Sequence, residues 1–102
     1  MNSRNKGKRG EAELAKVLRQ YGYTGARRGQ QYRGSPDSPD VTGIEGVHIE
    51  CKRVERLDLY AAMEQSKADA GADTPVVMHR KNGKPWLVTM ELPAWIEMQK
   101  RN

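Results

Sequence analysis

The sequence has a single cysteine, no phenylalanine and no long run of apolar residues. A lone cysteine cannot form an internal disulfide, and it excludes a zinc site built from several thiolates. No segment approaches the roughly 20 apolar residues that a membrane-spanning helix needs. No signal-peptide pattern opens the chain. These absences predict a soluble, cytoplasmic protein without a membrane partner.

The small size of the chain limits its architecture. It has 102 residues, of which 36% are hydrophobic, so there is room for one modest core and no second domain. We therefore expect a single domain over residues 1–102. Burial of further apolar surface between two copies would suit such a chain, which favours a homodimer.

Charge is distributed unevenly along the chain. Residues 1–34 carry nine Lys and Arg against two Glu, residues 35–79 carry four against nine Asp and Glu, and residues 80–102 carry five against two. Basic segments therefore flank an acidic middle, and residues 1–9 form a basic N-terminal arm. Such clusters are typical of proteins that contact phosphates. The charge pattern alone leaves a nucleic-acid partner and a merely solvated charged face equally open. Together with the acid–lysine motif of the acidic middle, it favours a nucleic-acid partner.

The acidic middle contains the most informative pattern of the sequence. Residues 47–52 alternate in polarity, so the odd-numbered ones can face a core while Glu50 and Lys52 project together from the other face. If Asp40 lies on the neighbouring strand, two carboxylates and one ammonium meet at one point. Carboxylates in this number bind Mg²⁺, and a bound Mg²⁺ activates water for phosphodiester hydrolysis. The pattern predicts a metal site with a lysine beside it.

Two aspartates compete for the first position, because Ser-Pro-Asp occurs twice in residues 35–40. Asp40 is followed by Val41-Thr42, which can start a strand. Asp37 is followed by Ser38-Pro39, and proline cannot donate to a sheet ladder. We therefore favour Asp40 as the ligand and expect Asp37 to be a turn residue.

At these residues the chain resembles the PD-(D/E)xK nuclease superfamily, and within it the Holliday junction resolvases of the archaeal type and their small phage relatives. The matching residues run along most of the chain. They are Gly7, Glu11, Leu14, Arg28, Gly34-Ser35, Asp40, Glu50-Cys51-Lys52 and the stretch 78–88. The chain departs from the resolvases at Ala12, where they often carry Arg, and in the duplicated Ser-Pro-Asp.

The resemblance implies a restriction-endonuclease-like α/β domain, with a central mixed β-sheet flanked by helices. It implies that Asp40 and Glu50 bind Mg²⁺, with Mn²⁺ possible, and that the backbone carbonyl of Cys51 adds a ligand. It also implies that Lys52 is catalytic and that Glu11, from the first helix, completes the acidic cluster. From the residues alone, Glu11 would be an ordinary first-turn acid, favoured there by the helix dipole.

Several basic or polar residues around the predicted site are candidates for contact with DNA phosphates. They lie in the N-terminal arm and in the Gly- and Arg-rich stretch before the acidic loop. These candidates are Lys6, Lys8, Arg9, Arg27, Arg28, Arg33 and Ser35.

The order of expected elements is helix, three strands, helix, hairpin, helix. Helical spacing predicts the first helix over residues 10–21. Asp58 can cap a helix that ends at Gly71, and Asn82-Gly83 is a strong hairpin signal. The strands are expected near 25–28, 41–42, 47–52, 75–79 and 86–90, and the last helix at 92–100.

Two histidines and one glutamine have no firm role. His48 shares a face with Glu50 and Lys52, yet a solvated or sheet-edge histidine is the more ordinary interpretation. His79 precedes a basic turn and is expected to be exposed. Gln65 lies near a position where related nucleases carry a further polar residue, although a solvated helix face is the ordinary alternative. Cys51 is expected to point into the core.

The predicted function is a magnesium-dependent DNA endonuclease, most plausibly a dimeric resolvase that makes paired cuts in four-way junctions. One alternative keeps the same site but acts on flaps, mismatches or ordinary duplex DNA, because one fold serves many substrates. Another is a basic nucleic-acid-binding module without catalysis. The metal dependence of DNA cleavage distinguishes the last alternative from the first two.

Overall fold

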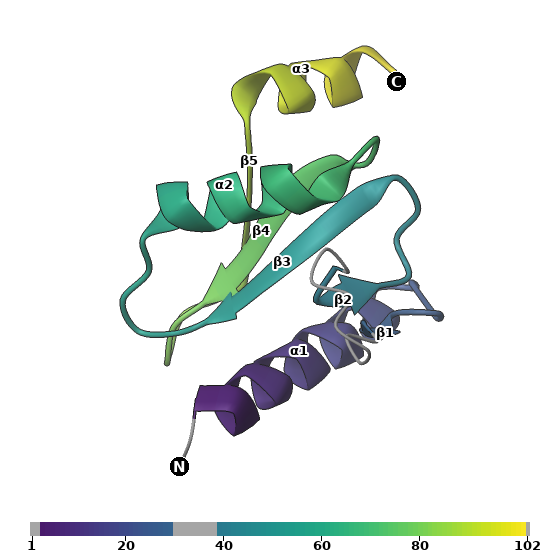
Figure 1. Cartoon of the computed structure of the whole chain (residues 1–102). Helices are drawn as coiled ribbons and strands as arrows, with labels where there is room; N and C mark the ends of the chain where they lie inside the picture. The colour runs from purple at the N-terminus through teal and green to yellow at the C-terminus, as the bar shows by residue number, and fades with distance from the viewer. Residues whose placement is uncertain (1–2, 30–38, 102) are drawn as a thin grey trace.

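The computed structural model describes residues 3–29 and 39–101, with side chains from Gly7 onward. The elements follow the expected order, and the sheet is mixed, with strands in the order β1-β2-β3-β4-β5 (Figure 1). Only β3 and β4 are parallel among the paired strands. The elements are α1 Ser3–Gln20, β1 Arg27–Arg28, β2 Val41–Thr42, β3 Val47–Arg53, α2 Leu59–Ala70, β4 Thr74–Arg80, β5 Leu87–Met90 and α3 Leu92–Lys100.

Helices cover both faces of the central pair β3 and β4 (Figure 1). On the α1 face, Leu14 and Ala15 pack against Ile49 and Cys51. On the α2 face, residues of that helix pack against Val77 of β4. Because both faces are covered, β3 is buried over residues 48–51 without interruption. Alternation along β3 therefore separates two buried faces.

Helix α1 begins earlier than expected. It starts at Ser3 rather than Gly10, so the basic residues up to Arg9 belong to the helix. Glu11 consequently lies in mid-helix, and no acidic residue occupies the first turn. The expectation that the helix dipole stabilises Glu11 was wrong for this reason. Within the described residues, no helix combines the length and apolar character needed to cross a bilayer.

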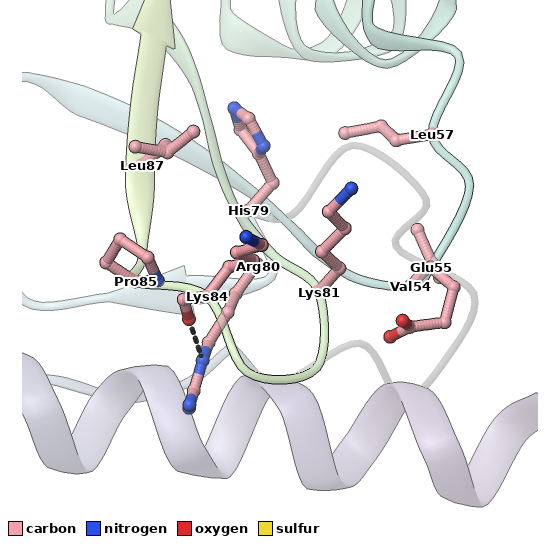
Figure 2. A pocket seen from close by; sticks show the side chains of 9 residues that line it. All are labelled: Val54, Glu55, Leu57, His79, Arg80, Lys81, Lys84, Pro85 and Leu87. Atoms are coloured by element: carbon pink, nitrogen blue, oxygen red, sulfur yellow. Dashed lines mark hydrogen bonds between the residues drawn. The ribbon is translucent and has the colours of Figure 1, made fainter.

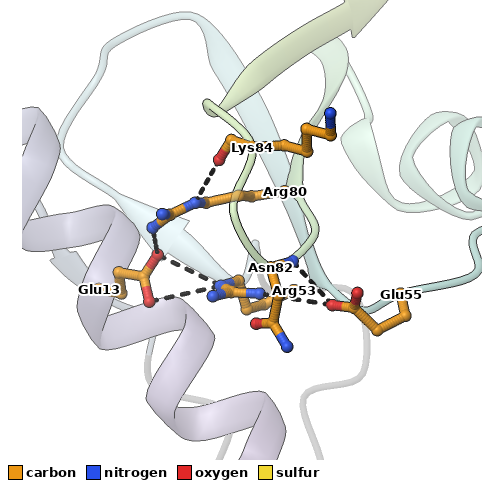
Figure 3. A network of polar contacts seen from close by, with 6 residues as sticks. All are labelled: Glu13, Arg53, Glu55, Arg80, Asn82 and Lys84. Atoms are coloured by element: carbon orange, nitrogen blue, oxygen red, sulfur yellow. Dashed lines mark hydrogen bonds and ion pairs between the residues drawn. The ribbon is translucent and has the colours of Figure 1, made fainter.

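A polar network joins α1 to the C-terminal ends of β3 and β4 (Figure 3). Glu13 of α1 accepts a hydrogen bond from Arg80 of β4 at 2.6 Å and from Arg53 of β3 at 3.3 Å. Arg53 also pairs with Glu55 at 4.0 Å, and Glu55 accepts from the backbone N–H of Asn82 at 2.8 Å. One carboxylate thus joins three elements that are distant in sequence.

The approach of α1 to β3 depends on a glycine. A Cβ atom at Gly10 would lie 2.5 Å from Cβ of Arg53, whereas a Cβ at Gly7 would meet nothing within 4 Å. Glycine ordinarily weakens a helix interior. At Gly10 that cost is offset by the close packing that a side chain would prevent.

We expect Gly10→Ala and Gly7→Ala to change stability in opposite directions. Gly10→Ala should lower the free energy of unfolding by about 1–3 kcal/mol, because the methyl group overpacks the contact with Arg53. Gly7→Ala should raise it by about 0.5–1 kcal/mol through helix propensity alone. Urea unfolding followed by circular dichroism measures both. A stabilising Gly10→Ala would show that α1 does not lie this close to β3.

Helix α2 forms as the sequence predicts. Asp58 caps it by accepting from the Ala61 N–H at 3.0 Å, and Gly71 ends it with φ 59°. Its inner face is Ala62, Met63, Ser66 and Ala70. The fully buried Ser66 hydroxyl lies 3.2 Å from the carbonyl oxygen of His48 and 3.1 Å from that of Val76. This hydroxyl therefore joins α2 to both central strands.

The β4–β5 hairpin forms around Asn82-Gly83, as predicted, with Lys84 N–H donating to the Lys81 carbonyl at 3.1 Å. Helix α3 follows, but none of its residues is buried. Trp95, Ile96 and Met98 are 46%, 41% and 44% exposed. Figure 1 shows α3 beyond the end of β5, away from α1. These apolar residues therefore do not join the core.

Candidate functional site

Asp40 lies immediately before β2 and is held against β3 by two backbone contacts. Its own N–H donates to the Ile49 carbonyl at 2.9 Å, and its Oδ2 accepts from the Cys51 N–H at 2.8 Å. The second contact places the carboxylate beside the Glu50-Cys51-Lys52 segment. Asp40 thus occupies the predicted position next to β3. Asp37 lies outside the described residues.

Glu50 and Lys52 project from the same face of β3, as the alternation predicted. Lys52 Nζ lies 3.6 Å from Glu50 Oε2. Glu50 is only 9% exposed, and the pKa of its carboxyl is raised to about 7. Burial is the main cause and the charge of Asp40 the next, while Lys52 acts in the opposite direction. An acid with this pKa is half protonated near neutral pH and binds a cation strongly once it is ionised.

Glu11 reaches the same region from α1. Its pKa is raised, first by burial and then by the charge of Asp40, against the lowering effect of Arg28. Arg28 of β1 pairs with it, with Nε 3.2 Å from Oε1. Three acids from α1, the start of β2 and β3 therefore share one electrostatic environment. Lys52 and Arg28 offset part of its negative charge.

The side chain of Cys51 belongs to the core, whereas its backbone groups belong to the candidate site. The side chain packs in the α1-face core, as expected, and burial raises the pKa of the thiol far above its usual value, so the thiol is unreactive. The Cys51 N–H and the Ile49 carbonyl both bond Asp40, so this side of β3 faces the β2 edge. The Cys51 carbonyl is directed to that same edge, because alternate residues of a strand share their hydrogen-bonding direction.

The donor set fits a hard divalent cation. Asp40 and Glu50 offer carboxylate oxygens, and the Cys51 carbonyl offers a third oxygen at the same edge of β3. Mg²⁺ and Mn²⁺ accept such ligands and complete their shells with water. The charge of Asp40 contributes to the raised pKa values of both Glu11 and Glu50, so negative charge is crowded here, and a cation would relieve that crowding.

The predicted DNA-contacting residues are only partly described. Lys8, Arg9, Arg27 and Arg28 are exposed on α1 and β1, although Arg28 also pairs with Glu11. Lys6 lies on α1, but its side chain is outside the described residues. Arg33 and Ser35 also lie outside them. The four exposed cations extend from the first half of α1 to the edge strand β1.

Both histidines differ from their expected environments. His48 was expected to be solvated or at a sheet edge, but it is 3% exposed, because α2 covers its face of the central strand β3. Its Nε2 is buried and has no hydrogen-bond partner among the residues that the structure describes. His79 was expected to be exposed but is half-buried, with Nε2 2.9 Å from Thr89 Oγ1, and burial lowers its pKa. Both expectations were wrong because they ignored the elements that pack over β3 and β4.

Asp69 belongs to the same polar region, although sequence reasoning missed it. It lies on α2, its charge raises the pKa of Glu50, and Gln65 donates a hydrogen bond to its Oδ2 at 2.7 Å. Gln65 is therefore engaged with a carboxylate and is not merely solvated. The spacing of Asp69 three residues after Ser66 places it beside the inner face of α2. Nothing in the sequence indicates that β3 lies opposite.

A separate hollow of about 380 Å³ lies beside the β4–β5 turn (Figure 2). Lys81, Lys84 and His79 contribute to its walls. Arg80, which also lines it, is engaged by the Lys84 carbonyl at 2.6 Å and by Glu13. The hollow contains one acid, Glu55, and lacks the paired carboxylates of the Asp40 region, so it is not the metal centre.

Comparison with known proteins adds no identification. No family model matches the chain, and no curated protein or solved structure is significantly similar to it.

Proposed function

We propose that the chain is a divalent-metal-dependent DNA endonuclease of the PD-(D/E)xK kind, with a restriction-endonuclease-like fold. The observation that carries the proposal is the contact between Asp40 Oδ2 and the Cys51 N–H, at 2.8 Å. It brings the carboxylate of one segment to the acid–lysine pair of another, across a sheet of mixed topology. A region that only stabilised the fold would not need Glu11, Asp40 and Glu50 to lie close together beside a lysine.

Each residue has a distinct role in this proposal. Asp40, Glu50 and the Cys51 carbonyl would hold the ion, Mg²⁺ or Mn²⁺. When bound, the ion lowers the pKa of its water and neutralises charge on the scissile phosphate. Lys52 provides a compact positive charge that orients the attacking water and stabilises the phosphate oxygens. Glu11 completes the acidic cluster, and Arg28 orients Glu11 through their ion pair.

The proposed substrate is branched DNA, specifically a four-way junction. The exposed cations of α1 and β1 lie near the acidic site and suit phosphate contacts, including Lys8 and Arg27. A four-way junction has two-fold symmetry, and an isologous homodimer would present two equivalent sites to it. The exposed apolar residues of β5 and α3, such as Val88 and Trp95, offer a surface for that dimer.

Two other functions would use parts of the same surface. A nuclease with this site could instead cut flaps, mismatches or ordinary duplex DNA. A non-catalytic DNA-binding module would need only the basic residues. The buried Glu50 favours the enzymes, because an acid whose pKa is raised despite its ion pair with Lys52 has no use in phosphate binding.

The test is cleavage of a labelled four-way junction and a linear duplex of matched sequence, with Mg²⁺ and with EDTA. We expect paired cuts in the junction that require the ion, and sedimentation of the protein as a dimer in the same buffer. Equal cutting of both substrates would leave the active site standing but remove the junction preference. Binding without cleavage in Mg²⁺ or Mn²⁺ would contradict the nuclease proposal.

A further inference from the structure

We propose that His48, Glu50 and Asp69 form a second cation site, between β3 and α2, for a transition-metal ion such as Zn²⁺ or Mn²⁺. Two of its three ligands take no part in the proposed nuclease centre, and only Glu50 is shared. The proposal does not depend on nuclease activity.

The three side chains already converge. Each offers one ligand atom, and these atoms lie within 4.8 Å of one another. Metal–ligand bonds of about 2.0–2.2 Å allow two ligand atoms to be up to about 4.4 Å apart across the ion. Small side-chain rotations would therefore suffice to bring all three onto one ion.

The burial and hydrogen bonding of His48 provide independent evidence for a bound ion. This residue is only 3% exposed, and within the described part of the chain its Nε2 has no hydrogen-bond partner. An unpaired buried polar atom is costly and is rare in native proteins. A histidine that served only to fill space beside two carboxylates could be replaced by an apolar residue at no such cost. A bound cation would give the imidazole a partner.

Neighbouring residues hold the ligands in place. The Ser66 hydroxyl bonds the His48 carbonyl at 3.2 Å and so fixes the backbone of that ligand. The Gln65 amide donates to Asp69 Oδ2 at 2.7 Å, which leaves Oδ1 for an ion. Such outer partners are typical of metal sites, because they orient the ligands. Lys52, which pairs with Glu50, and Gln65 also line an open hollow of about 370 Å³.

The ligand types select the class of ion. An imidazole nitrogen with two carboxylates suits Zn²⁺, Mn²⁺ and similar ions, whereas Mg²⁺ prefers an all-oxygen set. When no cation is present, the charge of Asp69 makes ionisation of Glu50 less favourable. The site should therefore be distinguishable from the Asp40 centre by its metal preference and by its dependence on His48.

The experiment uses the full chain and Zn²⁺ alone, without DNA. Long-range ¹H–¹⁵N spectra should show a large shift of one His48 ring nitrogen on addition of Zn²⁺. The chain has only two histidines, and His79→Gln assigns the signals while leaving the site intact. Calorimetry should show Zn²⁺ affinity falling at least about 10-fold in Asp69→Asn and in Gln65→Ala, as for ligand and outer-partner losses elsewhere.

Asp40→Asn separates the two metal sites. This substitution removes a ligand of the nuclease centre only, so the shift of the His48 nitrogen should persist in the variant. That expectation holds whether or not the variant or the wild type cleaves DNA. Half-buried Asp69 tolerates Asn without refolding of the core, which amide spectra verify. An unmoved His48 nitrogen at saturating Zn²⁺ would overturn the proposal. So would a Zn²⁺ affinity that falls in Asp40→Asn but not in Asp69→Asn.

Discussion

Asp40→Asn is expected to abolish metal-dependent DNA cleavage while leaving DNA binding close to that of the wild type. The substitution removes the charge of a proposed metal ligand, yet the Asn side-chain oxygen can still accept the Cys51 N–H bond that now measures 2.8 Å. The fold around β2 and β3 should therefore survive. Loss of one group that stabilises a transition-state charge typically costs about 10²–10³-fold in rate, so we expect a fall of at least that size.

The measurement is single-turnover cleavage of the labelled junction at saturating Mg²⁺, beside a binding assay in Ca²⁺. Glu45→Gln is the matched control, because it makes the same change of charge at an exposed position in the turn between β2 and β3. This control should cleave like the wild type. Cleavage that persists in Asp40→Asn would exclude Asp40 as a metal ligand.

Glu50→Gln is expected to stabilise the metal-free protein at pH 8, although it should also stop cleavage. The pKa of Glu50 rises from 4.5 to about 7 on folding, chiefly through burial. Between these values the folded protein holds a proton that the unfolded chain has lost, so stability falls as pH rises. Each unit of difference corresponds to about 1.4 kcal/mol. Glu50 should therefore reduce the free energy of unfolding by about 3 kcal/mol at pH 8.

Urea unfolding in EDTA between pH 4.5 and pH 8 measures this effect. The wild type should lose stability across the range, and Glu50→Gln should lose about 3 kcal/mol less. Glu45→Gln again serves as the control, because it makes the same change of charge at an exposed position. If Glu50→Gln is less stable than the wild type at pH 8, Glu50 has a compensating partner that offsets its burial. Added Mg²⁺ should stabilise the wild type more than the variant, through binding to the ionised carboxylate.

Much of the local structure follows from short-range chemistry. The Asp58 cap, the stop at Gly71 and the Asn82-Gly83 hairpin were predicted and are present, because each depends on a few neighbouring residues. Alternation in β3 correctly placed Cys51 opposite Glu50 and Lys52. The preference for Asp40 over Asp37 also used only neighbouring residues, because a proline two residues after Asp37 argues against a strand there.

The environments of the polar residues depended on packing across the chain. Alternation separates the two faces of a strand, but it cannot tell whether a helix covers the second face. His48 is therefore buried rather than solvated, and Asp69, from α2, joins Glu50 across that interface. Sequence spacing contains no information on this meeting, because the two acids are brought together by the crossover between β3 and β4.

The sequence by itself determined the order of elements, the acid–lysine pattern and the caps and turns, because these arise from neighbours along the chain. The tertiary structure decided which charges are buried. It placed Glu11 in mid-helix beside Asp40, allowed α1 to approach β3 at Gly10, and left α3 without a buried face. Burial depends on which distant surfaces pack together. It raises the pKa of Glu50 and keeps His48 Nε2 from water.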